Sequence, residues 1–259
     1  MKTFQSVLYG FVVVLLVYFF YTMWSPYGAA QVDDVWVINL DRSPQRWEHM
    51  VQSTLQFSDR VHRFPAMDGK TITDPRPVHA EGVGYYFMRV TGGKEGELVN
   101  KGVVGCWLSH KRLLTHLASL NLGAGVGHLI LEDDVQLPDK FLSGSKSPVG
   151  GQDRWSEVAR RIPYDWDIVY LGMSEGAKGE PVAEGVVKLA PGPQQWGTYA
   201  YLVKHGSIKT KILPALRFMT DAIDEQYNSL FGDLNAYCIR PAIIVPHAQV
   251  GAVSSILHS

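Results

Sequence analysis

Short apolar runs alternate along the chain with segments whose apolar positions recur at helical spacing. The runs at 35–40, 129–131 and 167–172 lack strict alternation of apolar and polar residues, which is typical of strands buried on both faces of a sheet. Helical spacing predicts helices over 44–55 and 103–117. Because strands alternate with helices, we expect an α/β fold with a mainly parallel central sheet flanked by helices.

Proline and serine mark the ends of two of the predicted helices. Ser43 is expected to cap a helix that has Pro44 at its first position, where the missing backbone N–H costs nothing. A later helical segment, 206–219, contains Pro214. An internal proline removes a backbone hydrogen bond, so we expect this helix to be kinked or broken there.

The first part of the chain has a different pattern. Residues 7–24 (VLYGFVVVLLVYFFYTMW) carry no charge, and a span of ~20 apolar residues is what a bilayer core requires. Lys2 precedes the span and Asp33 and Asp34 follow it, so the positive-inside tendency predicts a single-pass type II membrane protein. The expected parts are a cytoplasmic tail (1–6), a transmembrane anchor (7–24), a stalk (25–34) and a body (35–259) in the secretory pathway (Golgi or ER) or beyond an equivalent membrane. The alternative is a signal peptide cleaved near residues 28–31 (GAAQ).

Composition narrows the classes of function. The net charge of the 259 residues is −1, which argues against a nucleic-acid binder that relies on a broad basic surface. The two cysteines, Cys106 and Cys238, stand outside any CxxC or metal-ligand spacing, so a structural zinc site is not expected. We expect two buried free thiols, with one disulfide as the alternative.

Three adjacent acids follow one of the predicted strands. Glu132, Asp133 and Asp134 stand directly behind the apolar run 129–131. Neighbouring carboxylates raise each other's pKa unless a cation keeps them ionised. Alternation along a strand points Glu132 and Asp134 the same way, and oxygen ligands of this kind suit Mg²⁺ or Mn²⁺. The acids are therefore a candidate metal site that could also hold substrate phosphates, although a polar loop that is simply acidic remains the alternative.

Five segments together resemble glycosyltransferase family 25, which includes lipopolysaccharide galactosyltransferases and collagen hydroxylysine galactosyltransferases. In chain order the segments are VWVINLDRSPQRW, GVVGCWLSHKRLL, HLILEDDVQL, DIVYLG and WGTYAYLVKHGS. The resemblance implies a GT-A type nucleotide-sugar-binding fold. It also implies transfer of a hexose, often galactose from UDP-galactose, to a hydroxyl group on a glycan or a hydroxylated protein.

The resemblance also assigns roles to particular residues. Contacts to the UDP-sugar are expected from Asn39, Arg42, Arg46, Ser109, His110, Glu132, Asp133, Gly197 and Thr198. Ligands to Mn²⁺ (or Mg²⁺) are expected from Glu132, Asp134 and His247. Transfer with inversion needs a base that takes the proton of the acceptor hydroxyl. Asp224 is the candidate base, with Asp221 and Glu225 as rivals.

Each of these roles has a plainer alternative. Arg46 could be a solvated helix residue, His110 a buried structural histidine and Gly197 part of a strand bulge. Asp224 could be an acid favoured by the helix dipole at an N-terminus. For the whole protein, the alternatives are a metal-dependent phosphoesterase and an inactive, membrane-tethered module that binds sugar nucleotides.

Overall fold

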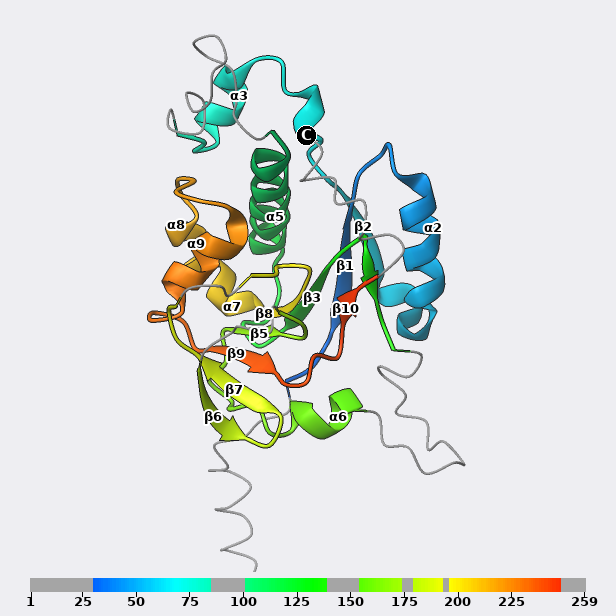
Figure 1. The fold of residues 1–259 in the computed structure, drawn as a ribbon, viewed down its shortest axis with the longest axis vertical. Helices are drawn as coiled ribbons and strands as arrows, with labels where there is room; N and C mark the ends of the chain where they lie inside the picture. Colours follow the sequence, from blue (N-terminus) through cyan, green and yellow to red (C-terminus); the bar gives the residue numbers. More distant parts are fainter. Residues whose placement is uncertain (1–29, 85–100, 139–153, 174–178, 193–195, 248–259) are drawn as a thin grey trace, which may run out of the picture.

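The computed structural model describes residues 30–84, 101–138, 154–173, 179–192 and 196–247 (Figure 1). The predicted tail and anchor, and the stalk up to residue 29, lie outside these ranges. Within the ranges, no helix combines the length and the apolar character needed to cross a bilayer.

One sheet of eight strands forms the centre of the molecule, in the order β2-β1-β3-β8-β5-β9-β7-β6. The strands are β1 (Asp34–Asn39), β2 (Val61–Pro65), β3 (Gly127–Glu132), β5 (Ile168–Tyr170), β6 (Gly179–Ala183), β7 (Val186–Leu189), β8 (Ala200–Lys204) and β9 (Ala236–Ile239). Strand β1 is parallel to β2 and β3, and β5 is parallel to β9. The remaining neighbours pair antiparallel, so β7 and β8 oppose the other six strands. The sheet is therefore mixed, with most strands running one way, and the predicted α/β class is confirmed.

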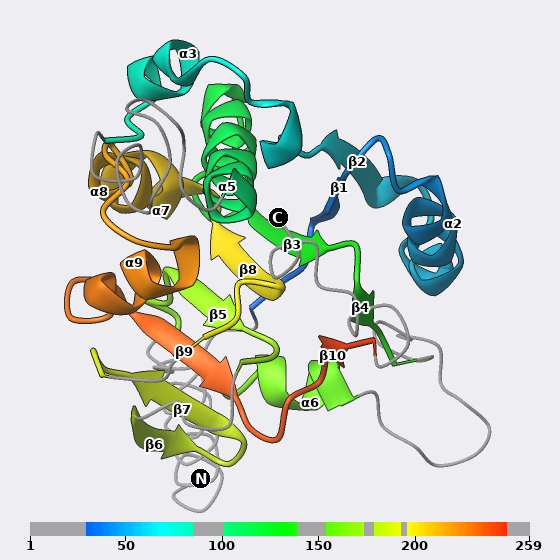
Figure 2. The same ribbon diagram turned by 45° about the horizontal axis from the view of Figure 1, so that its top comes forward.

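Helices cover both faces of this sheet. They are α2 (Pro44–Ser53), η1 (Leu55–Arg60), η2 (Gly69–Thr71), α3 (Pro75–Ala80), α5 (Lys101–Ser119), α6 (Arg154–Ala159), α7 (His205–Ser207), η3 (Ile208–Ile212), α8 (Leu213–Ala215) and α9 (Ile223–Leu230). Figures 1 and 2 show α5, α7, α8 and α9 on one side of the sheet, and α2 and α6 on the other. A separate ribbon of β4 (Val135–Gln136) and β10 (Val245–Pro246) lies beside the end of β3.

Alternation along the strands builds two cores. In β1, Trp36 and Ile38 belong to the core under α5 and α9, whereas Val35 and Val37 belong to the core under α2 and α6. The same alternation continues in β3, where Ile130 joins the first core. A strand buried on both faces needs apolar residues at every position, which explains why these runs lack a polar face.

The first turns of α5 lie very close to the loop after β2. A Cβ on Gly69 would stand 1.8 Å from the carbonyl oxygen of Lys101, and one on Gly105 would stand 2.6 Å from that of Met67. Only glycine permits this approach. It is further fixed by Ser109, whose hydroxyl donates to the Gly105 carbonyl (2.6 Å) and accepts from the Met67 amide (2.8 Å). The inner face of α5 is thereby placed beside the carboxyl ends of β1 and β3.

The later helical segment differs from its prediction. Helix α7 continues through the π-helical turn η3 into α8, and Pro214 lies in the first turn of α8. The helix ends at Ala215, one residue after the proline, rather than running to 219. The π-helical turn before the proline and the end of the helix one residue after it agree with the break expected at Pro214.

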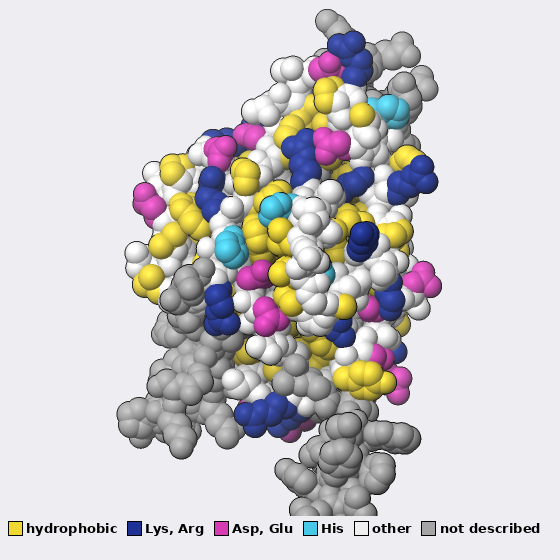
Figure 3. All heavy atoms as spheres, turned by 180° about the vertical axis from the view of Figure 1, so that it is seen from behind, with side chains coloured by type: hydrophobic (Ala, Val, Ile, Leu, Met, Phe, Trp, Pro, Cys, Tyr) yellow, Lys and Arg dark blue, Asp and Glu magenta, His cyan; other side chains and the backbone are white. Residues whose placement is uncertain are grey.

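Charged side chains are mixed on the face that Figure 3 shows, where basic and acidic groups are interspersed with apolar ones. Elsewhere opposite charges pair at short range, as Arg63 with Asp41 (2.6 Å) and Arg161 with Glu157 (2.9 Å). Exposed pairs of this kind are worth about 1 kcal/mol or less each. The stability of the fold therefore rests mainly on its two cores.

Candidate functional site

The carboxyl ends of β1 and β3 meet at one edge of the sheet. Because Ile38 pairs with Glu132 in the parallel register, Asn39 lies next to Asp133. The start of β8 reaches the same edge from the opposite direction, and the Glu132 amide donates to the Tyr199 carbonyl (2.9 Å). The acidic segment thus leaves the sheet between two neighbouring strands.

Asp133 is held by two hydrogen bonds inside the protein. Its Oδ2 accepts from Asn39 Nδ2 at 2.6 Å, and its Oδ1 accepts from Arg46 Nη1 at 3.0 Å. The orientation of the Asn39 amide is itself fixed, because Nδ2 also donates to the Ser43 carbonyl and Oδ1 accepts from Arg63 Nε. Asp133 is 6% exposed. Its carboxylate therefore anchors the turn after β3.

Asp134 lies in a very different environment. Burial raises the pKa of Asp134 to about 7, the carboxylates of Glu132 and Asp133 add to the shift, and Arg46 opposes it. Arg46 Nη1 is 3.6 Å from the Asp134 carboxylate and also serves Asp133. Asp133 and Asp134 therefore share one guanidinium, which leaves negative charge for a cation or a proton to offset.

The β4–β10 ribbon brings His247 to the acidic segment. Val135 pairs with Pro246, and the His247 amide donates to the Asp134 carbonyl (2.7 Å). The His247 ring packs edge-on against His49 of α2, with ring centroids 4.7 Å apart. Two segments more than a hundred residues apart thus meet at this point through their backbones. Carboxylate oxygens and an imidazole are donor types that suit a hard divalent cation such as Mn²⁺ or Mg²⁺. In the described part of the chain, however, the ligand atoms of Glu132, Asp134 and His247 do not form a group at ligating distance.

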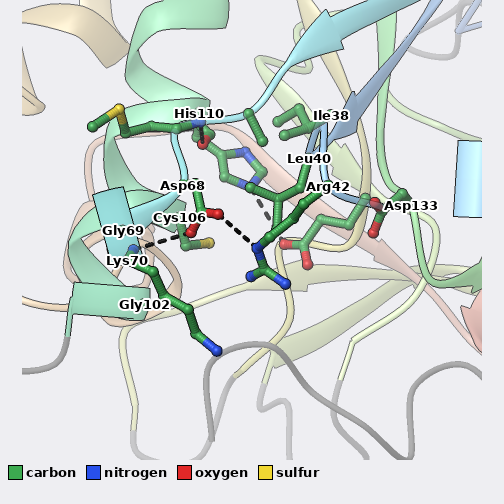
Figure 4. Close-up of a pocket in the computed structure, with 14 residues that line it drawn as sticks. Ile38, Leu40, Arg42, Asp68, Gly69, Lys70, Gly102, Cys106, His110 and Asp133 are labelled. Carbon is green, nitrogen blue, oxygen red and sulfur yellow. Dashed lines mark hydrogen bonds and ion pairs between the residues drawn. The ribbon is translucent and has the colours of Figure 1, made fainter. Parts of the chain in front are cut away.

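A pocket opens in front of these residues, between α5 and the loop after β2 (Figure 4). It is open to solvent on one side. Its lining comprises Ile38, Leu40, Arg42, Ala66, Met67, Asp68, Gly69, Lys70, Gly102, Cys106, Ser109, His110, Glu132 and Asp133. Arg42 donates to Asp68 (2.6 Å) and remains 42% exposed. The lining therefore combines apolar residues such as Ile38, Leu40 and Ala66 with two cationic side chains, Arg42 and Lys70.

Glu132 links this pocket to α5. Its Oε1 lies 3.3 Å from His110 Nε2 and accepts from the Thr198 hydroxyl at 3.4 Å. His110 Nδ1 in turn lies 2.9 Å from the Tyr201 hydroxyl, and His110 is 1% exposed. The imidazole is thus held on both sides, with one ring nitrogen facing the Glu132 carboxylate.

A second pocket adjoins the first and shares two of its residues. It is lined by Val103, Cys106, Glu132, Gly197, Thr198, Tyr199, Ala222, Ile223 and Asp224. Cys106 and Glu132 line both pockets. Burial raises the pKa of Asp224, with a contribution from the Glu132 charge, while backbone N–H groups at the start of α9 oppose the shift. Asp224 therefore shares the second pocket with Glu132, the carboxylate that also lines the first pocket.

The backbone conformation at position 197, beside this second pocket, requires glycine. Its φ is +120°, and a Cβ there would lie 2.7 Å from the Tyr199 ring. Side chains other than glycine rarely adopt such a φ. Any substitution at Gly197 would consequently strain the backbone and require Tyr199 or the chain to shift.

The structure brings most of the predicted residues together, though in three groups. Arg42, Ser109, His110, Glu132 and Asp133 line the first pocket, whereas Gly197, Thr198 and Asp224 join Glu132 in the second. Asn39, Arg46, Asp134 and His247 surround the turn after β3 and belong to the described lining of neither pocket. The rivals Asp221 and Glu225 are also outside both linings.

Sequence reasoning missed Asp68, Lys70 and Cys106. Cys106 precedes His110 by four residues, a spacing that places both side chains on one face of a helix. That spacing was available from the sequence. Lys70 follows a β-strand and a turn, and only its position in the fold reveals it as a pocket residue. Both cysteines are free thiols as predicted, although Cys106 is only half-buried.

The mixed sheet, its flanking helices and the acidic end of β3 are together consistent with a glycosyltransferase of the GT-A type. Sequence comparison is more specific: the model of glycosyltransferase family 25 (LPS biosynthesis protein) matches residues 32–149. The resemblance of this chain to glycosyltransferase family 25 is thereby confirmed.

Individual relatives extend the similarity to most of the chain. The probable inactive glycosyltransferase 25 family member 3 of Rattus norvegicus is 28% identical over 238 residues, which cover 85% of this chain and 39% of that protein. Procollagen galactosyltransferase 1-B of Xenopus laevis is 26% identical over 238 residues, covering 85% and 36%. The glycosyltransferase 25 family member of Drosophila melanogaster is 24% identical over 239 residues, covering 85% and 36%. The chain thus spans well under half the length of these curated relatives.

Proposed function

We propose that the protein is a metal-dependent glycosyltransferase that moves a hexose, galactose in the first instance, from a UDP-sugar to a hydroxyl acceptor with inversion. The observation that carries this proposal is the pair of adjoining pockets that share Glu132. Two substrates must meet at one reacting carbon, and each pocket supplies the groups that one of them needs. The similarity to family 25 supports the same reaction class.

The first pocket suits the UDP-sugar. Ile38, Leu40 and Ala66 provide apolar surface for the flat base, and Arg42 and Lys70 provide positive charge for the diphosphate. Arginine and lysine are the usual partners of phosphate oxygens. Ser109 and Asp133 already form hydrogen bonds within the protein. To contact the UDP-sugar they would have to form additional hydrogen bonds.

Glu132, Asp134 and His247 would hold the divalent cation, Mn²⁺ or Mg²⁺. When bound, the cation supplies Lewis-acid stabilisation of the charge that appears on the departing diphosphate. The chain's own contribution is orientation, because Asn39 and Arg46 fix Asp133 and so fix the turn from which Asp134 projects.

The second pocket suits the acceptor. Asp224 stands in the first turn of α9 and lines this pocket opposite Glu132. An acid whose pKa is raised accepts a proton more readily near neutral pH. Asp224 would take the proton of the acceptor hydroxyl as the hydroxyl oxygen attacks the anomeric carbon from the face opposite the diphosphate. Attack from that face inverts the configuration.

Trp196 gives the acceptor a further surface. It precedes the pocket residue Gly197, is 48% exposed, and its indole N–H donates to Glu225. An aromatic ring held in one orientation offers a flat apolar face with a polar edge, which suits a sugar ring or an extended hydroxylated peptide. A glycan acceptor and a hydroxylated protein acceptor both fit, and the residues 7–24 would place the reaction at a membrane in the secretory pathway or its equivalent.

A module that binds the sugar nucleotide without transferring it is the second candidate. It is favoured by the names of relatives such as the Rattus norvegicus protein, which is called probable inactive. The presence of Glu132 in both pockets and Asp224 in the second, with Asp134 in the turn after β3, favours the active enzyme. The family model and the relatives are named as glycosyltransferases, which does not favour the metal-dependent phosphoesterase.

Release of UDP from the full chain in detergent tests the proposal. We expect release with one UDP-sugar of a panel, dependent on Mn²⁺ and increased by acceptor. Asp224→Asn should abolish transfer while leaving UDP binding unchanged, and Asp221→Asn, which alters an exposed acid outside both pockets, should keep full activity. Binding of UDP without release of UDP from any sugar would establish the non-catalytic module instead.

A further inference from the structure

We propose that Cys106, His110 and Glu132 form a second metal site, selective for a softer divalent ion of the Zn²⁺ class. The donor atoms of these three residues all lie within 4.8 Å of one another. Cys106 and His110 are four residues apart on α5, so they share one helix face, and Glu132 approaches from the end of β3. Figure 4 shows Cys106 and His110 on the pocket side of α5.

The distances suit a tetrahedral zinc ion after a small adjustment. Bond lengths of about 2.3 Å to sulfur and about 2.0–2.2 Å to nitrogen or oxygen place tetrahedral donor atoms about 3.3–3.7 Å apart. His110 Nε2 and Glu132 Oε1 are already 3.3 Å apart. The Cys106 sulfur is within 4.8 Å of both, so rotation about its single side-chain bond is the movement required. The fourth position would open to a pocket and to water or a substrate oxygen.

Neighbouring hydroxyl groups support each of the two non-sulfur ligands. The Tyr201 hydroxyl lies 2.9 Å from His110 Nδ1, and the Thr198 hydroxyl donates to Glu132 Oε1 at 3.4 Å. Such partners orient metal ligands and select the imidazole tautomer. A phenol can accept as well as donate, so Tyr201 can accept from a protonated Nδ1 and leave the Nε2 lone pair for the ion. His110 is 1% exposed and held between α5 and β8, which fixes its ring before any ion binds.

Binding of Zn²⁺ releases one proton from the protein. The Zn–S bond forms as the Cys106 thiol gives its proton to the buffer, and the imidazole keeps its single proton on Nδ1. Thiolate and imidazole are the ligands that distinguish Zn²⁺ from Mn²⁺ or Mg²⁺, which prefer oxygen. The site therefore recognises an ion different from the one proposed for the acidic cluster.

The two metal sites cannot be filled independently, because Glu132 belongs to both. Occupation of the Cys106 site by Zn²⁺ would withdraw Glu132 from the harder ion and narrow the junction between the pockets. We therefore expect Zn²⁺ to inhibit transfer in competition with Mn²⁺. This inhibition rests on the proposed function, whereas zinc binding itself does not.

Cobalt(II) provides a direct readout of binding, because thiolate coordination to Co²⁺ produces a near-ultraviolet charge-transfer band. The full chain is titrated with Co²⁺ and then with Zn²⁺. We expect the band in the wild type and in Cys238→Ala, which alters the other thiol of the chain, and its disappearance on addition of Zn²⁺. Cys106→Ser should lack the band and bind Zn²⁺ about 100-fold more weakly or worse, since loss of even a supporting residue costs about 10–100-fold.

A measurement on the unaltered protein guards against variants that fail to fold. Zn²⁺ should protect Cys106 from alkylation by iodoacetamide, as read by mass spectrometry of the peptide, and Mn²⁺ at the same concentration should not. Absence of the cobalt band in the wild type, its persistence in Cys106→Ser, or alkylation of Cys106 at the same rate with Zn²⁺ would each overturn the proposal. None of these readouts depends on transfer, so failure of the zinc site is distinguishable from failure of the proposed function.

Discussion

Replacement of Asp134 by Asn should stabilise the metal-free protein and remove most of the proposed Mn²⁺-dependent transfer. Burial, Glu132 and Asp133 raise the pKa of Asp134 from 3.8 to about 7. The folded protein therefore binds the proton more tightly than the unfolded chain does, and stability falls as pH rises between these two values. Asparagine has nearly the same shape and no charge, so Asp134→Asn removes the loss of stability that the wild type shows as pH rises.

The size of the effect follows from the shift. Each pKa unit corresponds to about 1.4 kcal/mol, so the full shift corresponds to about 4 kcal/mol above pH 7. The Asp134 side chain is 21% exposed and lies 3.6 Å from Arg46, an attraction that the substitution also removes. Solvent screening and this lost attraction reduce the expected gain to about 1–2 kcal/mol.

Urea unfolding in EDTA measures this gain. We expect Asp134→Asn to be more stable than the wild type at about pH 8 and nearly equal to it at about pH 4, where the wild-type carboxyl is protonated when folded. Addition of Mn²⁺ at about pH 8 should then stabilise the wild type and leave the variant unchanged, because ligand binding to the folded state raises stability. UDP release by the variant should fall by at least about 100-fold, a few kcal/mol of barrier.

Two results would refute this reasoning. If Asp134→Asn lowered stability in EDTA at high pH, the carboxylate would be making favourable contacts rather than bearing uncompensated charge. If Mn²⁺ stabilised the variant as much as the wild type, Asp134 would not be a ligand, and the metal would have to bind elsewhere.

Three further substitutions test other parts of the structure. Asp133→Asn should lower the unfolding free energy by about 2–4 kcal/mol in urea, because its new amide N–H groups would face Asn39 or Arg46; unchanged stability would contradict the anchoring role. Asp224→Asn should reduce kcat by at least about 100-fold with UDP affinity unchanged in calorimetry, and loss of that affinity would remove Asp224 as the base. Burial raises the pKa of Asp167, but hydrogen bonds from Lys211, Ser207 and the Asn235 amide lower it by more than burial raises it. The pKa of Asp167 is therefore below its usual value of 3.8. Asp167→Asn should therefore cost about 3 kcal/mol at neutral pH, a difference that disappears as the pH falls through the lowered pKa of Asp167 and the wild type loses stability; a difference independent of pH would show that charge is not the cause.

The pattern of apolar residues in the sequence located those site residues that follow directly after a strand. The apolar runs predicted β1 and β3, and parallel pairing of these runs suffices to bring Asn39 beside Asp133. The contact between Arg46 and Asp133 depends on the angle at which α2 leaves the sheet, which no local pattern encodes. The strand β6 was missed because its residues, Gly179–Ala183, are mostly exposed and include a proline. Such an edge strand lacks the apolar signal that identified the inner ones.

The acids after β3 differ in what they contribute to stability, and this difference bears on whether the protein is active. Asp133 is bonded by Asn39 and Arg46 and stabilises the fold, whereas Asp134 carries charge that the described neighbours leave largely uncompensated. Sequences usually avoid an uncompensated buried charge unless a site requires it. A module that only bound nucleotide through the first pocket would gain stability from a neutral residue at 134 and would have no use for Asp224 in the second. The presence of both acids is therefore an argument for transfer, and it stands or falls with the response of Asp134→Asn to Mn²⁺.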